Sequence, residues 1–367
     1  MFGRYRYALR HDVSIGCHDK TSVRALPTLQ AQQGIVREER MTMAVRVQFK
    51  QHGGPEVLEL VTFEPQAPGR GEVRVRNEAI GMNFIDIYYR EGLYPVDSFP
   101  AGLGGEGAGV IDAVGEGVSG FAVGDRVAYA SVGRGAYADQ LCLPASRLVH
   151  LPDDISCEQA AAVMVKGLTV QYLFRQTYPL KAGDTVLFHA AAGGVGTIAC
   201  QWARAMGVKL IGTVSTDEKA QLAKSLGAWA TINYAKESVP ERVLALTEGR
   251  KCPVVYDSVG MATWEDSLDC LEPRGLMVSF GNASGPVTGV DLGILNRKGS
   301  LFVTRPTLKH YADTPEHTQA MSDELFQLIR EGHIDATPRN RFALKDVRHA
   351  QEALASRALM GLHVLLP

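Results

Sequence analysis

The alternation of apolar and polar residues divides the 367-residue chain into stretches of different character. Residues 1–42 show no sustained period, although Arg4, Arg6 and Arg10 would suit an organelle transit segment. The acidic residues of the same stretch weaken that interpretation, since transit segments are usually poor in acids. We therefore interpret 1–42 as a disordered extension or a mis-assigned start, with ordered patterning from Met43 onward.

Short strands are expected from Ala44 to about residue 150. The runs AVRVQF and EVRVRNEAI alternate apolar and polar residues, as half-buried strands do. The glycine-dense stretch GLGGEGAGVIDAVGEGVSG adds short β runs that are split at turn or bulge positions. This part of the chain predicts a compact, irregular β-rich domain.

From Cys157 the pattern changes to helices that alternate with short apolar strands. The run CEQAAAVMVKGLTVQYLFRQTY is rich in helix formers and contains no proline. Strand and helix patterns then repeat, beginning with DTVLFHAA and VGTIACQWARAMG. Such repetition predicts an α/β fold, with a parallel sheet covered by helices on both faces. The tail from about Glu316 predicts two helices and the strand LHVLLP, which we expect to return to the β-rich domain.

Composition and charge exclude some classes of protein. With 46% hydrophobic residues the chain is not intrinsically disordered as a whole. The 38 basic and 40 acidic residues give a net charge of -2, which disfavours broad nucleic-acid or membrane-surface binding but leaves a local basic patch open. The six cysteines form no C-x-x-C pair, and no apolar run reaches the ~20 residues that span a bilayer. We expect a cytoplasmic protein with buried thiols.

The sharpest candidate site is HAAAGGVG, which lies between a predicted strand and a predicted helix. It varies the pattern G-x-G-x-x-G, with Ala191 in place of the first glycine. Such a loop turns tightly, lets a pyrophosphate approach the backbone and offers the N–H groups of a helix start to phosphates. It predicts a dinucleotide site, with a tight turn that binds no nucleotide as the alternative. The residues expected at the cofactor are Gly193, Gly194, Val195 and Gly196.

The end of the next predicted strand indicates which dinucleotide binds. NAD enzymes usually place an acid there, which accepts a hydrogen bond from the ribose 2′-OH. No carboxylate stands at that strand end, which reads Gly212-Thr213-Val214-Ser215. Ser215, Lys219 and Tyr234 instead offer hydrogen bonds and one charge to a 2′-phosphate. This favours NADPH; the alternative for Lys219 taken alone is an ordinary solvated helix residue.

Several segments together resemble a known family. The glycine loop, AIGMNFIDIYYREGLYP, GLGGEGAGVI, GDRVAY, KGLTVQYL, VVYDSVG and GLMVSFGN are similar to the zinc-free, zeta-crystallin-like quinone oxidoreductases of the medium-chain dehydrogenase/reductase superfamily. The resemblance implies a GroES-like β-rich catalytic domain from residues 43–166 and 306–367. A Rossmann domain with a doubly wound parallel sheet, residues 167–305, would be inserted between them and bind NADPH. A homodimer is also implied, through the edge strand near GSLFVTR.

The resemblance also bears on metal binding. Zinc-dependent members of the superfamily need a cysteine where this chain has Asn83, and a histidine just before the glutamate of Gly105-Glu106. A catalytic zinc requires three protein ligands, so the loss of two predicts a site without metal. Glu106 then becomes a candidate structural carboxylate, whose partner the sequence does not identify.

By the same resemblance, the nicotinamide end of the cofactor cleft is lined by Asn83, Phe84, Ile85, Asp86 and Tyr88. Asn83, Tyr88 and Tyr94 form the implied catalytic set, and each tyrosine offers a flat face and a hydroxyl to a quinone. Either tyrosine alone would also suit a half-buried aromatic position. The other implied cofactor residues are Tyr172, Ser258, Phe280, Gly281, Asn282 and Arg357.

The expected activity is reduction of quinones by NADPH, through direct hydride or electron transfer. A quinone accepts hydride readily because its reduction product is aromatic, so the protein mainly has to align the partners and exclude water. A reductase of activated alkenes, with Tyr94 as proton donor, is one alternative. An NADPH-binding module for AU-rich RNA, as reported in the family, is another, which the near-neutral charge does not favour. His189, beside the glycine loop, is expected to be structural.

Overall fold

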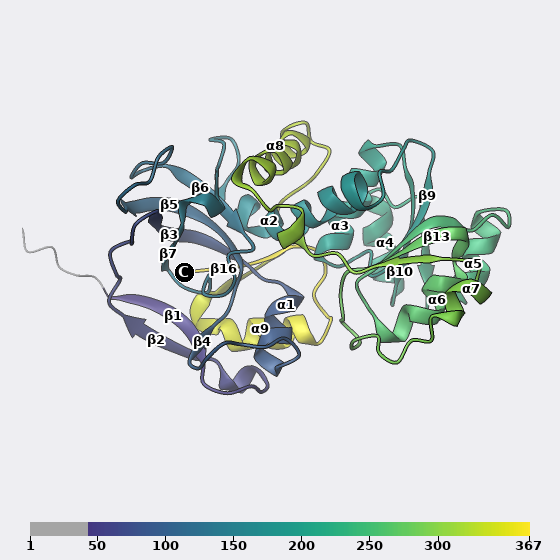
Figure 1. The fold of residues 1–367 in the computed structure, drawn as a ribbon, viewed down its shortest axis with the longest axis horizontal. Coiled ribbons are helices and arrows are strands. Elements are labelled where there is room, and N and C mark those ends of the chain that lie inside the picture. The colour runs from purple at the N-terminus through teal and green to yellow at the C-terminus, as the bar shows by residue number, and fades with distance from the viewer. Residues whose placement is uncertain (1–42) are drawn as a thin grey trace, which may run out of the picture. The chain divides into compact units, whose positions relative to one another are not determined.

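The computed structural model describes residues 43–367, and the interpretation of residues 1–42 lies outside this range (Figure 1). A β-rich part at the beginning and end of this range is joined to a parallel α/β part in the middle.

Two sheets build the β-rich part. In the smaller sheet β1 (Ala44–Phe49) pairs with β2 (Glu59–Phe63) and β4 (Ala101–Gly102). The larger sheet has the order β15-β16-β3-β5-β6-β8, with β7 also paired to β3. Its strands are β3 (Glu72–Gly81), β5 (Glu106–Val114), β6 (Arg126–Ala130), β7 (Gln140–Pro144), β8 (Leu148–His150), β15 (Asn340–Ala343) and β16 (His363–Leu366).

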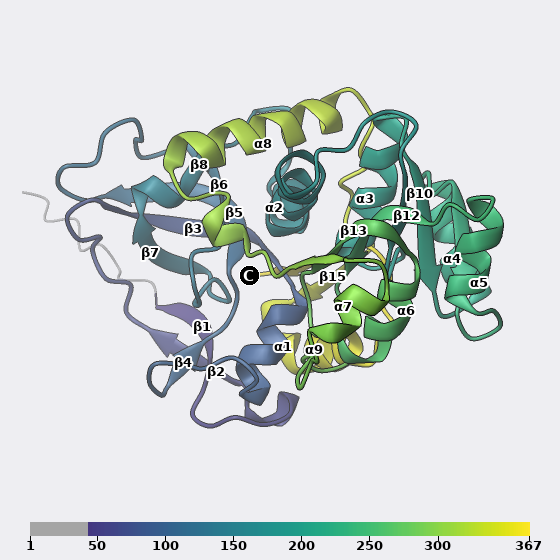
Figure 2. The same ribbon diagram turned by 45° about the vertical axis from the view of Figure 1, so that its right-hand side comes forward.

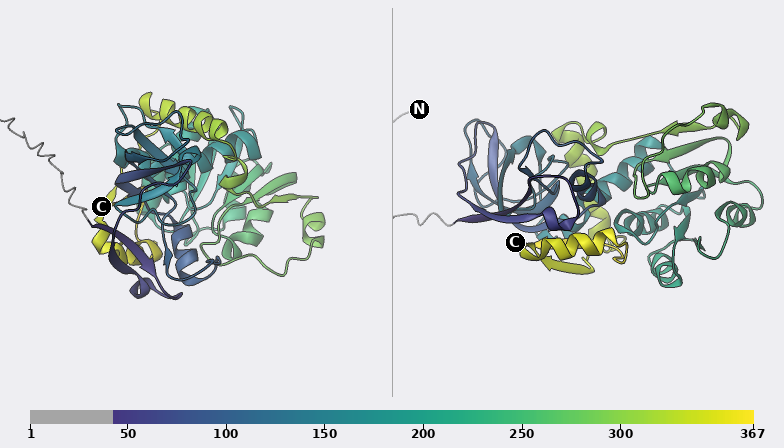
Figure 3. Two further views of the ribbon diagram at one scale, coloured as in Figure 1. Left: turned by 60° about the vertical axis from the view of Figure 1, so that its left-hand side comes forward. Right: turned by 90° about the horizontal axis from the view of Figure 1, so that it is seen from below.

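The C-terminal strand returns to this sheet, as the sequence predicts. Strand β16 runs antiparallel to β3 and pairs Val364 with Gly81. Leu365, from the end of the chain, therefore shares a core with Val47, Val73 and Ile111 from its beginning. The yellow C-terminal segment accordingly lies against the purple and blue N-terminal strands (Figure 3).

The α/β part is a six-stranded parallel sheet with the order β11-β10-β9-β12-β13-β14. The first strand, β9, is central, and the chain moves outward to β10 and β11 before returning to β12 on the other side of β9. Ligands bind at such a reversal of strand order, beyond the carboxyl ends of the strands. The strands are β9 (Thr185–Phe188), β10 (Lys209–Val214), β11 (Ala230–Asn233), β12 (Cys252–Asp257), β13 (Leu271–Ser279) and β14 (Phe302–Thr304).

Helices follow the predicted pattern in this part, which confirms the predicted α/β fold class. Apolar faces of these helices pack on the sheet; Ile198 and Trp202, for example, are fully buried in the core beside Val186 and Leu210. The helices are α3 (Gly194–Ala205), α4 (Asp217–Ser225), α5 (Val239–Leu246), α6 (Trp264–Asp269) and α7 (Gly293–Arg297).

Helix α2 (Cys157–Tyr172) connects the two parts and is buried on nearly every side. It lies between α3 and α8 (Pro315–Arg330) and also packs on β3 and β5 (Figure 2). Its start is fixed by Ser156 and Gln159, whose side chains each accept a hydrogen bond from the other residue's backbone N–H. One core thus runs through both parts along α2, and the domain boundaries expected at 166/167 and 305/306 stay predictions.

Two further helices complete the β-rich part: α1 (Phe84–Glu91) and α9 (Val347–Ala355), which pack against each other. The sequence predicts α9 but not α1, because the short run FIDIYYRE has aromatic and β-branched residues with no clear helical preference. None of the helices described is long and apolar enough to cross a membrane.

Candidate active site

The glycine loop joins β9 to α3 at the reversal of strand order. The N–H of Gly193 donates to the carbonyl of Ala190 at 2.9 Å, and Ala190 has a positive φ of 55°. A Cβ atom on Gly196 would lie 2.4 Å from the same carbonyl oxygen, so only glycine fits there. Because the first N–H groups of a helix have no partner within it, Gly194, Val195 and Gly196 present donors at the positive end of α3.

A buried polar network fixes the strand ends around this loop. His189 contacts Thr213 Oγ1 through Nδ1 and Ser267 Oγ through Nε2, both at 3.0 Å. Because Ser267 donates its hydroxyl hydrogen to Asp257, Nε2 of His189 carries the ring hydrogen. Burial lowers the pKa of His189 and favours the neutral ring. His189 has the structural surroundings that the sequence suggests.

Two of the three residues predicted around the 2′-phosphate, Ser215 and Lys219, come together at the end of β10, and Arg357 of the predicted cofactor cleft joins them. Lys219 Nζ donates to Ser215 Oγ at 3.2 Å and to the carbonyl oxygen of Arg357 at 2.9 Å. Arg357 has a positive φ of 58° and donates from Nη2 to the carbonyl of Ala283 at 2.6 Å. Tyr234 directly follows β11 and has an exposed ring.

An acid at the start of the neighbouring helix has its own partners. Asp217, in the first turn of α4, accepts hydrogen bonds from Asn233 Nδ2 at 2.9 Å and from Lys236 Nζ at 2.5 Å. The hydrogen bond from Lys236 lowers the pKa of Asp217, which keeps this exposed carboxylate ionised. The strand end itself carries Ser215 and no acid, in the arrangement that suits a phosphate.

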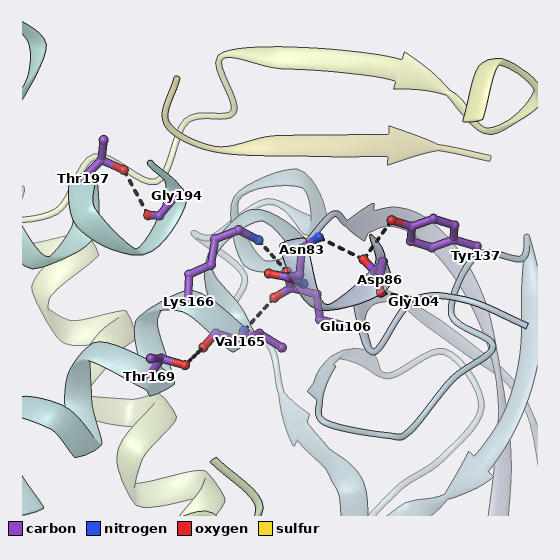
Figure 4. A network of polar contacts seen from close by, with 10 residues as sticks. All are labelled: Asn83, Asp86, Gly104, Glu106, Tyr137, Val165, Lys166, Thr169, Gly194 and Thr197. Carbon is purple, nitrogen blue, oxygen red and sulfur yellow. Dashed lines mark hydrogen bonds and ion pairs between the residues drawn. The ribbon is translucent and has the colours of Figure 1, made fainter. Parts of the chain in front are cut away.

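Glu106, Lys166 and Asn83 converge where β5, α2 and the start of α1 meet (Figure 4). Glu106 Oε1 accepts from Lys166 Nζ at 2.6 Å and from Asn83 Nδ2 at 2.7 Å. Its Oε2 accepts from the backbone N–H of Val165 at 2.6 Å. The partner of the structural carboxylate is therefore Lys166. No group of three His, Cys, Asp or Glu side chains suited to a metal occurs within residues 43–367.

Lys166 is not among the residues predicted from the sequence, although a signal for it exists. It is the single charged residue in the apolar helical run AAAVMVKGLTV. Lysine is almost never fully buried without a partner, so its place in that run points to a buried acid nearby. The Lys166 stem also approaches the glycine loop, since a Cβ on Gly194 would lie 3.0 Å from Lys166 Cδ and Cε.

Asp86 lies beside Asn83 but is directed into the β-rich part. Its side chain is 1% exposed, and its carboxylate accepts hydrogen bonds from Asn83 N, Gly104 N and Tyr137 Oη. Burial raises the pKa of Asp86 to about 6. The geometry favours support of Asn83 over the direct cofactor contact that the resemblance implies for Asp86. Phe84 and Ile85 occupy the first turn of α1, and Ile85 is exposed.

Tyr88 and Tyr94 form an aromatic pair at the junction with the α/β part. Their ring centroids are 5.3 Å apart, and Phe84 packs on Tyr88 from the other side. The Tyr88 hydroxyl accepts from Asn282 N at 3.0 Å, and Asn282 Nδ2 donates to the Tyr94 hydroxyl at 3.4 Å. Burial raises the pKa of Tyr88 to about 12, so its hydroxyl stays protonated.

Arg305 is also absent from the residues predicted from the sequence. Its Nη1 donates to Ser279 Oγ and to the carbonyl of Gly281, and its Nη2 donates to the Tyr94 hydroxyl at 3.3 Å. It follows β14 directly, so only the folded sheet brings it to Tyr94. An exposed arginine after a strand gives no signal in the sequence.

The remaining predicted cofactor residues lie at the ends of β12 and β13 and at the end of α2. Phe280 packs on Phe188 with ring centroids 5.7 Å apart. A Cβ atom on Gly281 would lie 2.3 Å from the carbonyl oxygen of Ser258, which explains this glycine. Tyr172 stacks on Tyr311 at 4.5 Å, a partner that the sequence did not indicate.

Known proteins share this architecture. Residues 69–153 match the alcohol dehydrogenase GroES-like domain, and residues 194–322 match the zinc-binding dehydrogenase domain. Quinone oxidoreductase of Pseudomonas aeruginosa is 64% identical over 325 residues, which cover 89% of this chain and 100% of that protein. 2-Haloacrylate reductase of a Burkholderia species is 42% identical over 336 residues, with 89% and 99% covered.

One similar solved structure contains a bound nucleotide. Escherichia coli quinone oxidoreductase complexed with NADPH has a TM-score of 0.87 at 55% sequence identity, covering 88% of this chain and 100% of that one. A GroES-like domain joined to a Rossmann sheet defines a medium-chain dehydrogenase/reductase. Within that superfamily, the chain belongs to the quinone oxidoreductase family, which confirms the resemblance seen in the sequence.

Proposed function

We propose that this protein binds NADPH and reduces quinones with it. The observation that carries the proposal is the cluster of Ser215, Lys219 and Arg357 at a strand end without an acid. A 2′-phosphate fits there because it gains a cation and a hydroxyl donor and meets no competing carboxylate. The E. coli relative whose structure contains NADPH supports the choice of cofactor.

The residues present suit the rest of the cofactor as well. Gly194, Val195 and Gly196 would hold the pyrophosphate through backbone N–H groups, and the missing side chain of Gly193 would let it approach the loop. Tyr234 would lie beside the adenosine end. The nicotinamide end would be held by Phe84, Ile85, Tyr172, Ser258, Phe280, Gly281 and Asn282. When bound, the reduced nicotinamide supplies a hydride, and the chain's own residues supply alignment and exclusion of water.

On the substrate side, we assign Tyr88 and Tyr94 to the quinone. Each tyrosine ring offers a flat apolar surface against which a quinone ring can stack. The Tyr94 hydroxyl, with Asn282 and Arg305 as donors, directs its own hydrogen away from them and can offer it to a quinone oxygen. Asn83, fixed by Glu106, would orient the nicotinamide against that face.

Quinone turnover tests the proposal directly. NADPH oxidation is followed by stopped flow with 1,4-benzoquinone or a naphthoquinone, against the uncatalysed rate without protein. We expect a protein-dependent rate that saturates with both reactants. A rate no greater than the uncatalysed one for every quinone would contradict the proposal.

A second candidate activity is the reduction of activated alkenes by NADPH. The contact of Arg305 Nη2 with the Tyr94 hydroxyl favours it, because hydride addition to a carbon requires a proton donor for the neighbouring carbon. The 2-haloacrylate reductase relative acts on an alkene by its name. Comparing kcat/KM for an enone and a naphthoquinone of similar size would rank the two activities.

We also propose that the protein is a cytoplasmic homodimer. Strand β14 is one of the two edge strands of the parallel sheet, and its Phe302 is 60% and Val303 40% exposed. An exposed apolar edge strand suits pairing with a second copy. The cysteines within residues 43–367 are free thiols, as in a reducing compartment. Light scattering after size exclusion would give twice the chain mass, and a Phe302→Lys variant would give less dimer.

A further inference from the structure

A continuous set of hydrogen bonds reaches Asn83 from the far side of the β-rich part (Figure 4). Asp86 Oδ2 accepts from the backbone N–H of Asn83 at 2.9 Å and from the Tyr137 hydroxyl at 2.9 Å. Its Oδ1 accepts from the N–H of Gly104 at 3.2 Å. The carboxylate thus has three donors around it and holds the residue immediately before α1.

Tyr137 is itself rigidly held. It is fully buried, its N–H donates to Leu103 O at 2.9 Å, and its carbonyl accepts from Val47 N at 2.8 Å. Its hydroxyl accepts from Gln351 Nε2 of α9 at 3.3 Å. Burial raises the pKa of the Tyr137 hydroxyl, which therefore keeps its hydrogen and donates it to Asp86.

The bonds continue beyond Asn83 toward the glycine loop. Asn83 Nδ2 donates to Glu106, Glu106 pairs with Lys166, and the stem of Lys166 approaches Gly194 at the start of α3. Asn83 is thereby held from two directions. Its backbone is fixed by Asp86 and its side chain by Glu106, so its amide has little freedom to rotate.

We propose that Tyr137 and Gln351 are positioning residues, which act through Asp86 to fix Asn83 for hydride transfer. The inference rests on the proposed function, because it assigns Asn83 to the nicotinamide. It goes beyond that function because it gives a role to two residues behind Asp86: Tyr137, on the segment before β7, and Gln351, on α9. Neither residue needs to contact the cofactor or the substrate.

This arrangement makes turnover depend on the ionisation of Asp86. The charged or titratable groups that act on it are Tyr137, Glu106 of β5 and Lys166 of α2, while Gln351 of α9 is neutral. A protonated Asp86 carries a hydrogen that faces three donors, so its bonds to Asn83 and Tyr137 weaken. Removing the Tyr137 hydroxyl takes away a donor that stabilises the carboxylate, which raises the pKa of Asp86 further.

The test compares Tyr137→Phe with Tyr129→Phe. Tyr129 is also fully buried, and it donates to Asn77 Oδ1 at 2.9 Å. Asn77 Nδ2 donates to the carbonyls of Ala136 and Ala138, beside Tyr137, and these bonds stay when only the Tyr129 hydroxyl is removed. For Tyr137→Phe we expect kcat for quinone reduction to fall about tenfold, with KM for NADPH within about twofold. The acidic limb of its pH profile moves upward by about half a pH unit or more. Tyr129→Phe keeps the unmodified kcat and profile.

A second variant covers the case in which Tyr137→Phe does not fold. Gln351→Met removes the donor to Tyr137 and also an Oε1 atom without a hydrogen-bond partner among the described residues, so the fold is retained. We expect a smaller upward shift of the acidic limb and a fall in kcat. Unchanged kcat and pH profile in both variants, or equal changes in Tyr129→Phe, would overturn the proposal.

Failure of the proposed function is distinguishable from failure of this inference. If the unmodified protein reduces no quinone, the proposed function is wrong. The fluorescence emission of bound NADPH then tests whether Tyr137 has the positioning role. That emission reports the surroundings of the reduced nicotinamide. It changes in Tyr137→Phe and not in Tyr129→Phe if the role is correct, and equal spectra for the two variants overturn it.

Discussion

The ammonium of Lys166 lies 2.6 Å from the carboxylate of Glu106, and both side chains are buried. Each charge compensates the other in a place that neither would enter alone. The same carboxylate holds the Asn83 amide, so the ion pair and the candidate active site share an atom, Glu106 Oε1. Stability and function are therefore coupled at this point of the molecule.

Replacing Lys166 by methionine should destabilise the fold strongly. The change leaves the Glu106 carboxylate buried without a counter-charge, for a loss of about 3–5 kcal/mol in the free energy of unfolding. Urea denaturation of Lys166→Met, Glu106→Gln and the double variant measures it. We expect the double variant to be more stable than Lys166→Met, because it removes the unpaired charge. A double variant that is no more stable than Lys166→Met would show that the pair is not coupled.

Lys219→Ala should remove the preference for NADPH. The variant loses a charge-assisted hydrogen bond to the 2′-phosphate, so Kd for NADPH rises about 10- to 100-fold, whereas Kd for NADH stays unchanged. Fluorescence titration with both nucleotides measures the two constants. Lys224→Ala, an exposed lysine in the last turn of the same helix, is the matched control and keeps both. Equal weakening of NADPH and NADH by Lys219→Ala would contradict the assignment.

Two glycines of the loop should respond differently to alanine. A Cβ on Gly193 would lie 3.3 Å from Ala190 O, which small shifts accommodate, whereas at Gly196 the distance is 2.4 Å. Gly193→Ala should therefore keep its melting temperature but lose NADPH affinity at least about tenfold, because the methyl group obstructs the pyrophosphate. Gly196→Ala should lower the melting temperature. Thermal unfolding with and without NADPH separates the two effects, and equal melting temperatures would contradict the explanation.

The buried His363 should make the protein less stable in acid. Its Nδ1 lies 3.1 Å from Asn340 Nδ2, an acceptor role that requires a neutral ring, and burial lowers its pKa to about 4. Because the unfolded state binds the proton more tightly, stability is lost as pH falls from about 6.5 to about 4. Asp86 has the opposite effect: its pKa is raised in the folded protein, so it adds stability as pH falls from about 6 to about 4.

His363→Gln isolates this contribution, since glutamine keeps a hydrogen-bonding group toward Asn340. The free energy of unfolding is measured by urea denaturation at several pH values. Its slope against pH in that window should decrease by the contribution of about one proton. His310→Gln, an exposed histidine, serves as the control. An unchanged slope in His363→Gln would show that His363 binds its proton equally well in the folded and unfolded states, and would contradict the lowered pKa.

Most of the α/β part could be predicted from the sequence because its signals are local. Strand and helix periods alternate from Thr185 onward, and the glycines of the loop have immediate steric reasons in the backbone. Ser215 and Lys219 are four residues apart and meet across the start of α4. Such features need only the geometry of one strand, loop or helix.

The network around Asn83 could not be predicted, because its contacts join residues far apart in the sequence. Tyr137 reaches Asp86 across 51 positions, and Gln351 reaches Tyr137 across 214. Each lies in a short irregular segment or a helix whose pattern reveals burial but not the partner. Arg305 illustrates the same limit, since its role depends on β14 taking the edge of the sheet.

The most direct test of the account is a stopped-flow measurement of naphthoquinone reduction with NADPH and with NADH at equal concentrations. The account predicts rapid reduction with NADPH and kcat/KM for NADH at least about tenfold lower, the value of one charge-assisted contact to the 2′-phosphate. No reduction above the uncatalysed rate, or equal kcat/KM for the two nucleotides, would contradict it.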